Sequence, residues 1–152
     1  MAYPVSGSPT TAFVDAIRAL LLADATLTGL LSSTTAVFGH LSEAERTDYP
    51  YVVLGRRSRT NDAGAMQTAG SMQALQIDVW SDHKGPAEAQ GICSRIAVLL
   101  ERSPTLTMTG FDYVQGSLTC ELEDVFDEPD EDSPDRRLYH GVQRWMAEIH
   151  DP

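Results

Sequence analysis

The chain has 152 residues, of which 42% are hydrophobic and 22% are charged. These values fit one globular domain with an ordinary core, and they exclude a disordered or fibrous chain. The formal net charge of -11 is local, because nine of the 22 acids and no base lie between Glu121 and Asp135. Removing these nine leaves 13 acids against 11 bases, with Lys84 the only lysine. Without a basic stripe to neutralise phosphates, tight binding to nucleic acid is excluded.

The cysteines and the N-terminus indicate a reducing compartment. Cys93 and Cys120 form no CxxC motif and have no histidine at metal-ligand spacing. Both fall within predicted secondary structure, so we expect buried free thiols and neither metal nor cofactor. The first residues lack the features of a secretory signal, and no stretch approaches the ~20 apolar residues of a membrane span. We therefore expect synthesis in the cytoplasm and no membrane contact.

The first element in chain order is a helix. After a flexible stretch at 1–9, apolar residues recur at helical spacing from Phe13 to Leu21, which predicts an amphipathic helix ending near Asp24. A short turn is expected at 26–31.

Strands and loops follow this helix. Val37 and Phe38 predict a short strand, and the polar stretch 41–49 predicts a loop that Pro50 closes. Aromatic and β-branched residues predict a strand from Tyr51 to about Ser58. Residues 59–71 contain few large apolar groups and are too long for a hairpin turn. We expect them to form a long loop that serves as a contact arm.

The middle of the chain carries the clearest periodicity. Residues 72–82 alternate, which predicts a strand with Leu75, Ile77 and Val79 facing the core. Pro86 suits the first turn of a helix that Pro104 ends. The apolar stripe of this helix is formed by Ala89, Ile92, Cys93, Ile96, Leu99 and Leu100.

The C-terminal part predicts two more strands around an acidic loop. A short extended piece at 106–111 leads to a turn, and residues 114–126 alternate as a strand with one wet face. Residues 127–135 hold two prolines and no large apolar residue, which predicts a mobile acidic loop. Residues 136–149 form a final strand, and its alternation leaves open which side is buried.

The order of these elements predicts a single α+β domain. Runs of neighbouring strands around one central helix favour an antiparallel or mixed sheet of about four main strands, with two helices packed on one face.

Common catalytic signatures are absent from the sequence. No GxGxxG, Walker A, HExxH or GxSxG motif occurs, and the four histidines are scattered. His140 lies in a predicted strand without a nearby nucleophile, which favours a packing or surface role over a catalytic base. The acidic run lacks the glycine and closing glutamate of an EF-hand, so a solvated loop is preferred to a calcium site. We therefore expect a protein that is not an enzyme.

Three arginines, Arg56, Arg57 and Arg59, stand at the mouth of the long loop. They fit a phosphate site, a solvated strand end, or ion pairs with acids of a neighbouring subunit. The sequence leaves these three readings open.

Three sequence blocks in succession resemble one known family. They are PYVVLG at 50–55, QIDVWSD at 76–82 followed by EAQGICSRIAVLL at 88–100, and YHGVQRWMA at 139–147. The N-terminal ALLLAD at 19–24 also fits. Together the blocks resemble the tail-completion or tail-terminator proteins of long-tailed bacteriophages and gene transfer agents. The acidic insertion around 127–135 departs from the family pattern.

The resemblance implies a virion structural protein of the tail and neck. It implies a homohexameric ring that caps the tail tube, stops its growth and joins the tail to the head connector. Its partners would be further copies of itself, the tail tube protein and the head-tail connector, while genome DNA passes through without specific binding. Free strand edges, which can pair between subunits, agree with this role.

Two groups of residues are candidates for the contacts of such a ring. The acids are expected to face either the central channel, where they would repel passing DNA, or the outer solvent. The possible channel-facing acids are Glu121, Glu123, Asp127, Glu128 and Asp130. The candidate assembly residues are Arg56, Arg57, Arg59, Asn61, Asp62, Met66, Trp80, His140 and Arg144.

Other functions stay open on the sequence alone. A head-to-tail connector or a tail tube protein is the alternative within the virion, and a tube protein would polymerise into long tubes. A small cytoplasmic enzyme would require a deep pocket that holds His140 beside a carboxylate. A DNA-mimicking acidic protein disagrees with the nearly neutral body.

Overall fold

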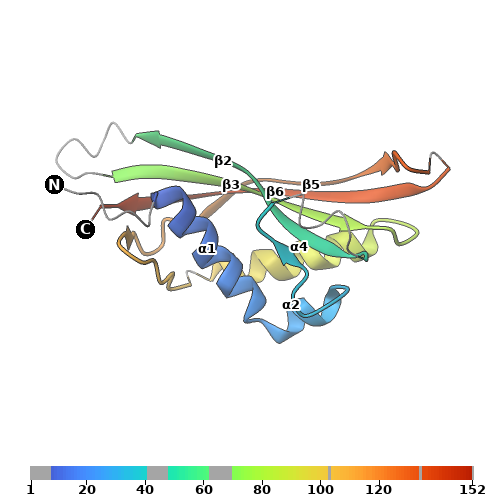
Figure 1. Cartoon of the computed structure of the whole chain (residues 1–152), viewed down its shortest axis with the longest axis horizontal. Coiled ribbons are helices and arrows are strands. Elements are labelled where there is room, and N and C mark those ends of the chain that lie inside the picture. The colour runs from blue at the N-terminus through green and yellow to red at the C-terminus, as the bar shows by residue number, and fades with distance from the viewer. Residues whose placement is uncertain (1–7, 41–47, 62–69, 103, 134, 152) are drawn as a thin grey trace.

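The computed structural model describes residues 8–40, 48–61, 70–102, 104–133 and 135–151. They form one mixed β-sheet, and the helices pack on one face of it. In Figure 1 the helices lie below the sheet. This arrangement confirms the predicted α+β class. In the described part of the chain, no helix is long and apolar enough to span a membrane.

The sheet has six strands in the described residues: the four main strands that were predicted, and two two-residue strands, of which β1 was predicted as a short strand and β4 was not. Its order is β1-β2-β3-β6, and β4 and β5 share the remaining edge of β6. Only β1 and β2 pair in parallel, and the other described pairs are antiparallel. The strands are β1 (Val37–Phe38), β2 (Tyr51–Asn61), β3 (Gly70–Ser81), β4 (Asp112–Tyr113), β5 (Thr119–Pro129) and β6 (Arg137–His150).

Three helices, one more than predicted, lie on the covered face in the described residues: α1 (Pro9–Leu22), α2 (Ala25–Leu30) and α4 (Ala87–Glu101). Helix α1 begins inside the stretch predicted to be flexible, because the Ser8 side chain accepts a hydrogen bond from Thr11 N at 3.0 Å and proline suits the first turn. Helix α2 replaces the predicted turn because Asp24 caps it, accepting a hydrogen bond from Leu27 N at 2.8 Å.

The core lies between the helices and one face of the sheet. As predicted, Leu75, Ile77 and Val79 are fully buried there. The register pairs Leu75 with Trp145 and Val79 with Gly141. The sequence left open which side of the last strand is buried, and the structure shows that it is the side with Gly141 and Trp145. Trp145 is itself fully buried.

A buried amide ties β6 to its neighbours inside this core. Gln143 donates to the carbonyl of Cys93 at 2.8 Å and accepts from Nε1 of Trp145 at 3.0 Å. It also donates to Glu123 at 2.5 Å. These bonds satisfy an amide that would otherwise be costly to bury.

The two cysteines differ in burial. Cys93 is buried as predicted, and its burial, together with the nearby Glu123 charge, raises the pKa of the thiol to about 12. Cys120 is only half-buried, because it lies on edge strand β5, and it donates to the carbonyl of Leu122 at 3.3 Å. Burial raises the pKa of Cys120 as well. Neither thiol is therefore an activated nucleophile.

The predicted contact arm at 59–71 is partly strand. Pairing continues past Ser58, with Arg59 opposite Gln73 and Thr60 opposite Met72. Strand β2 therefore runs to Asn61 and β3 begins at Gly70. The rest of this predicted loop lies outside the described residues.

The predicted acidic loop is also shorter than expected. Strand β5 runs to Pro129 because β6 offers it a full partner strand, with Asp127 opposite Tyr139 and Pro129 opposite Arg137. The predicted start of this strand at residue 114 is also wrong, because β5 begins only at Thr119. Gly116, at φ +82, makes a turn there, in which Ser117 N donates to Val114 O at 3.1 Å.

Candidate assembly surface

The sheet face away from the helices carries polar and aromatic side chains. Side chains alternate between the two faces of a strand, so the neighbours of the buried Ile77 and Val79 point to the bare side. No described helix covers this side (Figure 1). Its central residues are Gln76, Asp78 and Trp80 of β3, His140 and Arg144 of β6, and Phe126 of β5.

His140 is the centre of a cluster on this face. Its ring stacks on Trp80 with a centroid distance of 3.9 Å and an interplanar angle of 13°. Phe126 packs against the other side at 5.1 Å. Nε2 of His140 lies 2.7 Å from Asp78 Oδ1, and Nδ1 lies 3.2 Å from Glu128 Oε1. The cluster joins strands β3, β5 and β6 through one imidazole.

The two carboxylates favour the charged imidazolium. Burial by itself would lower the pKa of His140, but the hydrogen bonds to Asp78 and Glu128 outweigh it, so the pKa lies above the ordinary 6.5. Gln76 supports this arrangement by donating to Asp78 Oδ1 at 2.9 Å. The group thus joins one imidazole to two carboxylates on the sheet surface.

Gly55 makes room for the Asp78 carboxylate. A Cβ atom at this position would lie 2.5 Å from Asp78 Oδ2, closer than any normal contact. The β2 strand shifts register between Leu54 and Arg57, next to this glycine. A larger residue would therefore push the carboxylate away from His140.

The cluster borders an open depression of about 490 Å³. Its walls include Val53, Gly55, Arg57 and Trp80, and no serine, threonine or cysteine is among its described lining residues. His140 thus has the carboxylate that an enzyme would require. The depression is open, however, and its described lining residues include no nucleophile of these three kinds.

The three predicted arginines share one strand end but differ in their contacts. Arg57 donates to the carbonyl of Gly39, and to that of Leu54 at 3.1 Å. Arg56 and Arg59 are exposed and form no ion pair within the described residues. Arg144 lies on β6 instead, where it pairs with Glu121 at 3.1 Å.

The acids predicted to line a channel lie mostly along β5. Asp127 pairs with Arg137 at 2.6 Å, and the hydrogen bond from this arginine lowers the pKa of Asp127. Asp130, in the turn after β5, lies 4.0 Å from Arg136. Both faces of β5 are largely exposed, so the strand does not have the single wet face that was predicted. The orientation of these acids toward a channel stays a prediction.

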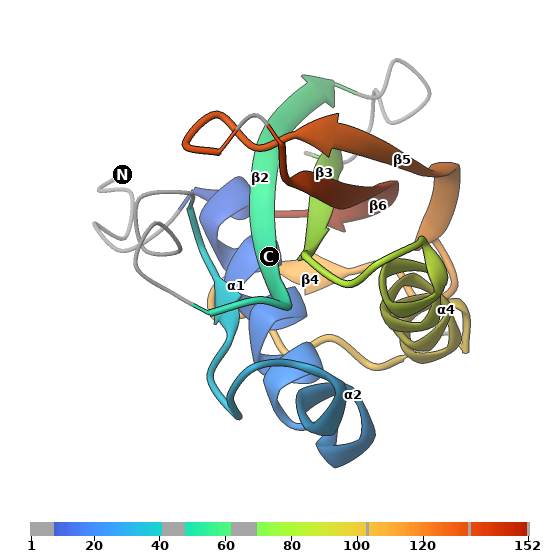
Figure 2. The same cartoon turned by 90° about the vertical axis from the view of Figure 1, so that its right-hand side faces the viewer.

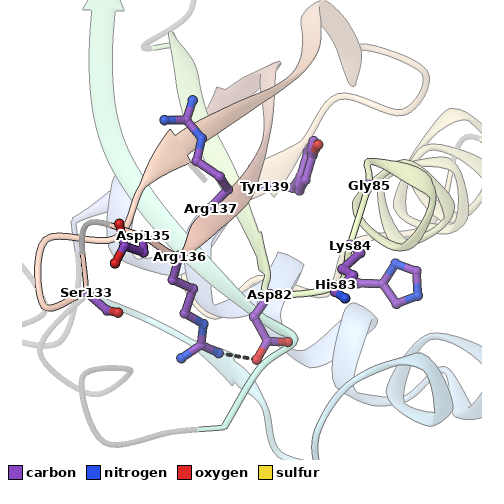
Figure 3. A pocket seen from close by; sticks show the side chains of 9 residues that line it. All are labelled: Asp82, His83, Lys84, Gly85, Ser133, Asp135, Arg136, Arg137 and Tyr139. Atoms are coloured by element: carbon purple, nitrogen blue, oxygen red, sulfur yellow. Dashed lines mark hydrogen bonds and ion pairs between the residues drawn. The ribbon is translucent and has the colours of Figure 1, made fainter.

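A second depression, of about 580 Å³, lies where the turn before β6 meets the loop before α4 (Figure 3). Arg136 forms an ion pair with Asp82 and lies 5.4 Å from the centroid of the Tyr49 ring. Sequence reasoning missed this contact. The only local signal for it was that both Asp82 and Arg136 lie next to segments with the composition of a turn or loop.

Three candidate residues cannot be placed on this surface. Asp62 and Met66, and the side chain of Asn61, lie outside the described part of the chain. Trp80 and His140, which were chosen separately, are brought into direct contact.

Taken together, the described residues form an α+β fold whose curved sheet presents a bare face with charged and aromatic side chains. A family model for tail completion protein gp17 matches residues 15–150, and the chain belongs to this family. It is therefore a structural protein of a virion tail, and its family is not one of enzymes.

A solved structure supports the fold. A chain in the virion of a native gene transfer agent (GTA) particle matches with a TM-score of 0.71 at 22% identity, over 98% of this chain and 99% of that chain. A comparison with curated proteins finds no match. The family predicted from the sequence blocks is thus confirmed.

Proposed function

We propose that the protein is a tail terminator that closes into a ring on the last ring of the tail tube. The ring stops further growth of the tube and presents a surface to the head connector. Membership of the tail completion family over residues 15–150 is the observation that carries this proposal.

The described surfaces support an assembly role. Two long strands, β2 and β5, lie toward opposite edges of the sheet, and the His140 cluster offers charged and aromatic groups on the bare face. Aromatic side chains such as Trp80 of this cluster are enriched at protein contacts relative to the rest of a protein surface. Phe126 and Leu122 of β5 are also apolar, with 38% and 52% of their surfaces exposed.

Tube assembly in vitro tests this function. Purified tail tube protein is allowed to polymerise with and without this protein, and tube lengths are measured by negative-stain microscopy. A terminator gives shorter tubes, each with an extra ring at one end. Long tubes formed by this protein alone would instead indicate a tube protein, and unchanged tube lengths with no bound ring would contradict the proposal.

A connector is distinguished by its binding partner. The protein is mixed separately with capped tubes and with filled heads. A terminator binds to the free end of a tube before any head is present. Binding only to heads would indicate the head-to-tail connector.

A further inference from the structure

We infer that copies of this chain join edge to edge, with strand β5 of one copy pairing with strand β2 of the next. This inference rests on the proposed ring and names its subunit contact. It commits to a second copy of the same chain as the occupant of each edge.

Both edges have backbone groups to offer. Among the described strands, β5 pairs only with β6, so its outer edge has no strand partner. At the other side of the sheet, β1 covers β2 only at Val52 and Val53. From Leu54 to Asn61 no described strand pairs with the outer edge of β2. Unpaired edges of this length are templates for pairing with another chain.

The two edges carry opposite charge. The stretch of β2 from Leu54 to Asn61 contains three arginines and no acid, whereas β5 contains five acids and no base. Arg56 and Arg59 are exposed on β2, and Asp124 and Asp127 are exposed on β5. Asp124 forms no ion pair within the described residues, whereas Asp127 is paired with Arg137 of its own copy. Opposite charges on neighbouring strands stabilise a sheet, and like charges destabilise it.

Strand direction agrees with this pairing. Each of the pairs β2 with β3, β3 with β6 and β6 with β5 is antiparallel, so β5 runs opposite to β2. Figure 2 shows β2 and β5 on either side of the two central strands. If the next copy continues the sheet with its helices on the same side, its β2 lies antiparallel to β5. The junction between two copies would then be an antiparallel strand pair, like the pairs between the long strands within each copy.

The charges also select the type of assembly. A two-fold dimer through β5 would place acids against acids, and one through β2 would place arginines against arginines. Only the unlike edges attract, which gives a head-to-tail contact. Such contacts close into rings when the rotation between copies permits it. In this arrangement the β5 carboxylates lie between subunits.

Charge reversal on each edge tests the contact. We choose Arg56→Glu with Arg59→Glu on β2, and Asp124→Lys with Asp127→Lys on β5. The change at Asp127 also removes its exposed ion pair with Arg137 of the same copy, which contributes little to stability. Arg57 is left intact because it binds its own backbone. Each double variant alone should lose at least 90% of the ring population that the wild-type protein shows in light scattering and negative-stain images. An equal mixture of the two should restore rings, because every junction in an alternating ring again joins unlike edges.

Matched controls reverse the same number of charges elsewhere. Lys84→Glu with Arg102→Glu mirrors the β2 variant, and Asp15→Lys with Glu101→Lys mirrors the β5 variant; all four residues are exposed. Circular dichroism and unfolding curves establish that each variant is folded. The controls should keep the wild-type ring population.

The outcomes separate the contact from the function. Rings in both folded edge variants, or no rescue on mixing, would overturn the edge pairing and leave the terminator function intact. A wild-type protein that stays monomeric at high concentration, and in the presence of tail tubes, would overturn the proposed function as well.

Discussion

Nε2 of His140 lies 2.7 Å from Oδ1 of Asp78, and each side chain is only 12% exposed. The two residues are 62 positions apart in the chain and meet because the register sets Trp80 beside His140 and Asp78 beside Val142. The pair therefore exists only when β3 and β6 are correctly aligned. It links the protonation of one imidazole to the stability of the sheet.

Stability should depend on pH through His140. Its pKa in the folded protein is raised above 6.5, so its stabilising effect is complete below 6.5 and is lost as the pH rises through the folded value. We expect the unfolding free energy of the wild-type protein, relative to a His140→Phe variant, to be larger at pH 5.5 than at pH 8.5. Urea unfolding across this range measures it.

The Asp78→Asn variant provides a second arm of the same experiment. It removes the nearer carboxylate, so most of the pH dependence of the unfolding free energy that comes from His140 should disappear. If the unfolding free energies of the wild type, His140→Phe and Asp78→Asn changed with pH in parallel, the His140–Asp78 pair would not contribute to the pH dependence.

Gly55→Ala should destabilise the protein by about 1–3 kcal/mol, because the new methyl group would overlap the Asp78 carboxylate. The displaced carboxylate should also bring the pKa of His140 down, which an NMR titration of the imidazole detects. Gly91→Ala is the control, since no atom apart from its chain neighbours and the backbone of its own helix α4 lies within 4 Å of its Cβ position. That change should stabilise the helix by about 0.5–1 kcal/mol. Equal effects at the two glycines would contradict this account.

Strong periodicity explains what the sequence could predict. The stripe of α4 and the alternation of β3 arise from residues close in the chain. The stripe matches the observed burial, with Leu99 partly buried and its other residues buried. The predicted core residues of β3 are buried as well, although Ala74 and Asp78 on its other face are also buried. The partners of His140 could not be predicted in this way. They depend on strand register across more than sixty residues, which local pattern does not encode.

Strand β5 shows why a composition argument failed. Residues 127–135 hold two prolines and no large apolar residue, so a loop from residue 127 was the natural expectation. Pairing with β6 overrides propensity, since Asp127 and Glu121 find arginines there. A register shift between Cys120 and Leu122 also breaks the simple alternation, and it leaves Leu122 52% exposed.

Asp24 should matter for both a helix cap and an ion pair. Its carboxylate accepts from Leu27 N at 2.8 Å and from Arg95 at 2.8 and 2.9 Å, and the bonds from Arg95 lower its pKa. Asp24→Ala should cost about 1–3 kcal/mol, whereas Asp24→Asn keeps a capping oxygen and should cost less. The contribution of the charge is present above pH 3.8 and is lost as the pH falls through the lowered folded value. Urea unfolding at pH 7 and at pH 3 checks both statements, and equal losses in the two variants would contradict the role of the cap.

Gly141 should be needed for the close approach of α4 to the sheet. A Cβ atom there would lie 2.5 Å from Sγ of Cys93 and 3.3 Å from Cβ of Val79. We expect Gly141→Ala to destabilise the protein by about 1–3 kcal/mol, since helix and strand would have to separate. Cys93→Ala alone should also destabilise, because it leaves a small cavity.

The double variant with both changes distinguishes this contact from a general loss of stability. The new methyl group on β6 would occupy part of the space that the sulfur leaves, so the double variant should be more stable than the sum of the single effects predicts, by about 1 kcal/mol. The rescue should be partial, because the Val79 contact at 3.3 Å remains. Unfolding free energies of the four proteins complete the cycle. Strict additivity would mean that the methyl group and the sulfur do not compete for the same space, and the packing of α4 on β6 would then have another cause.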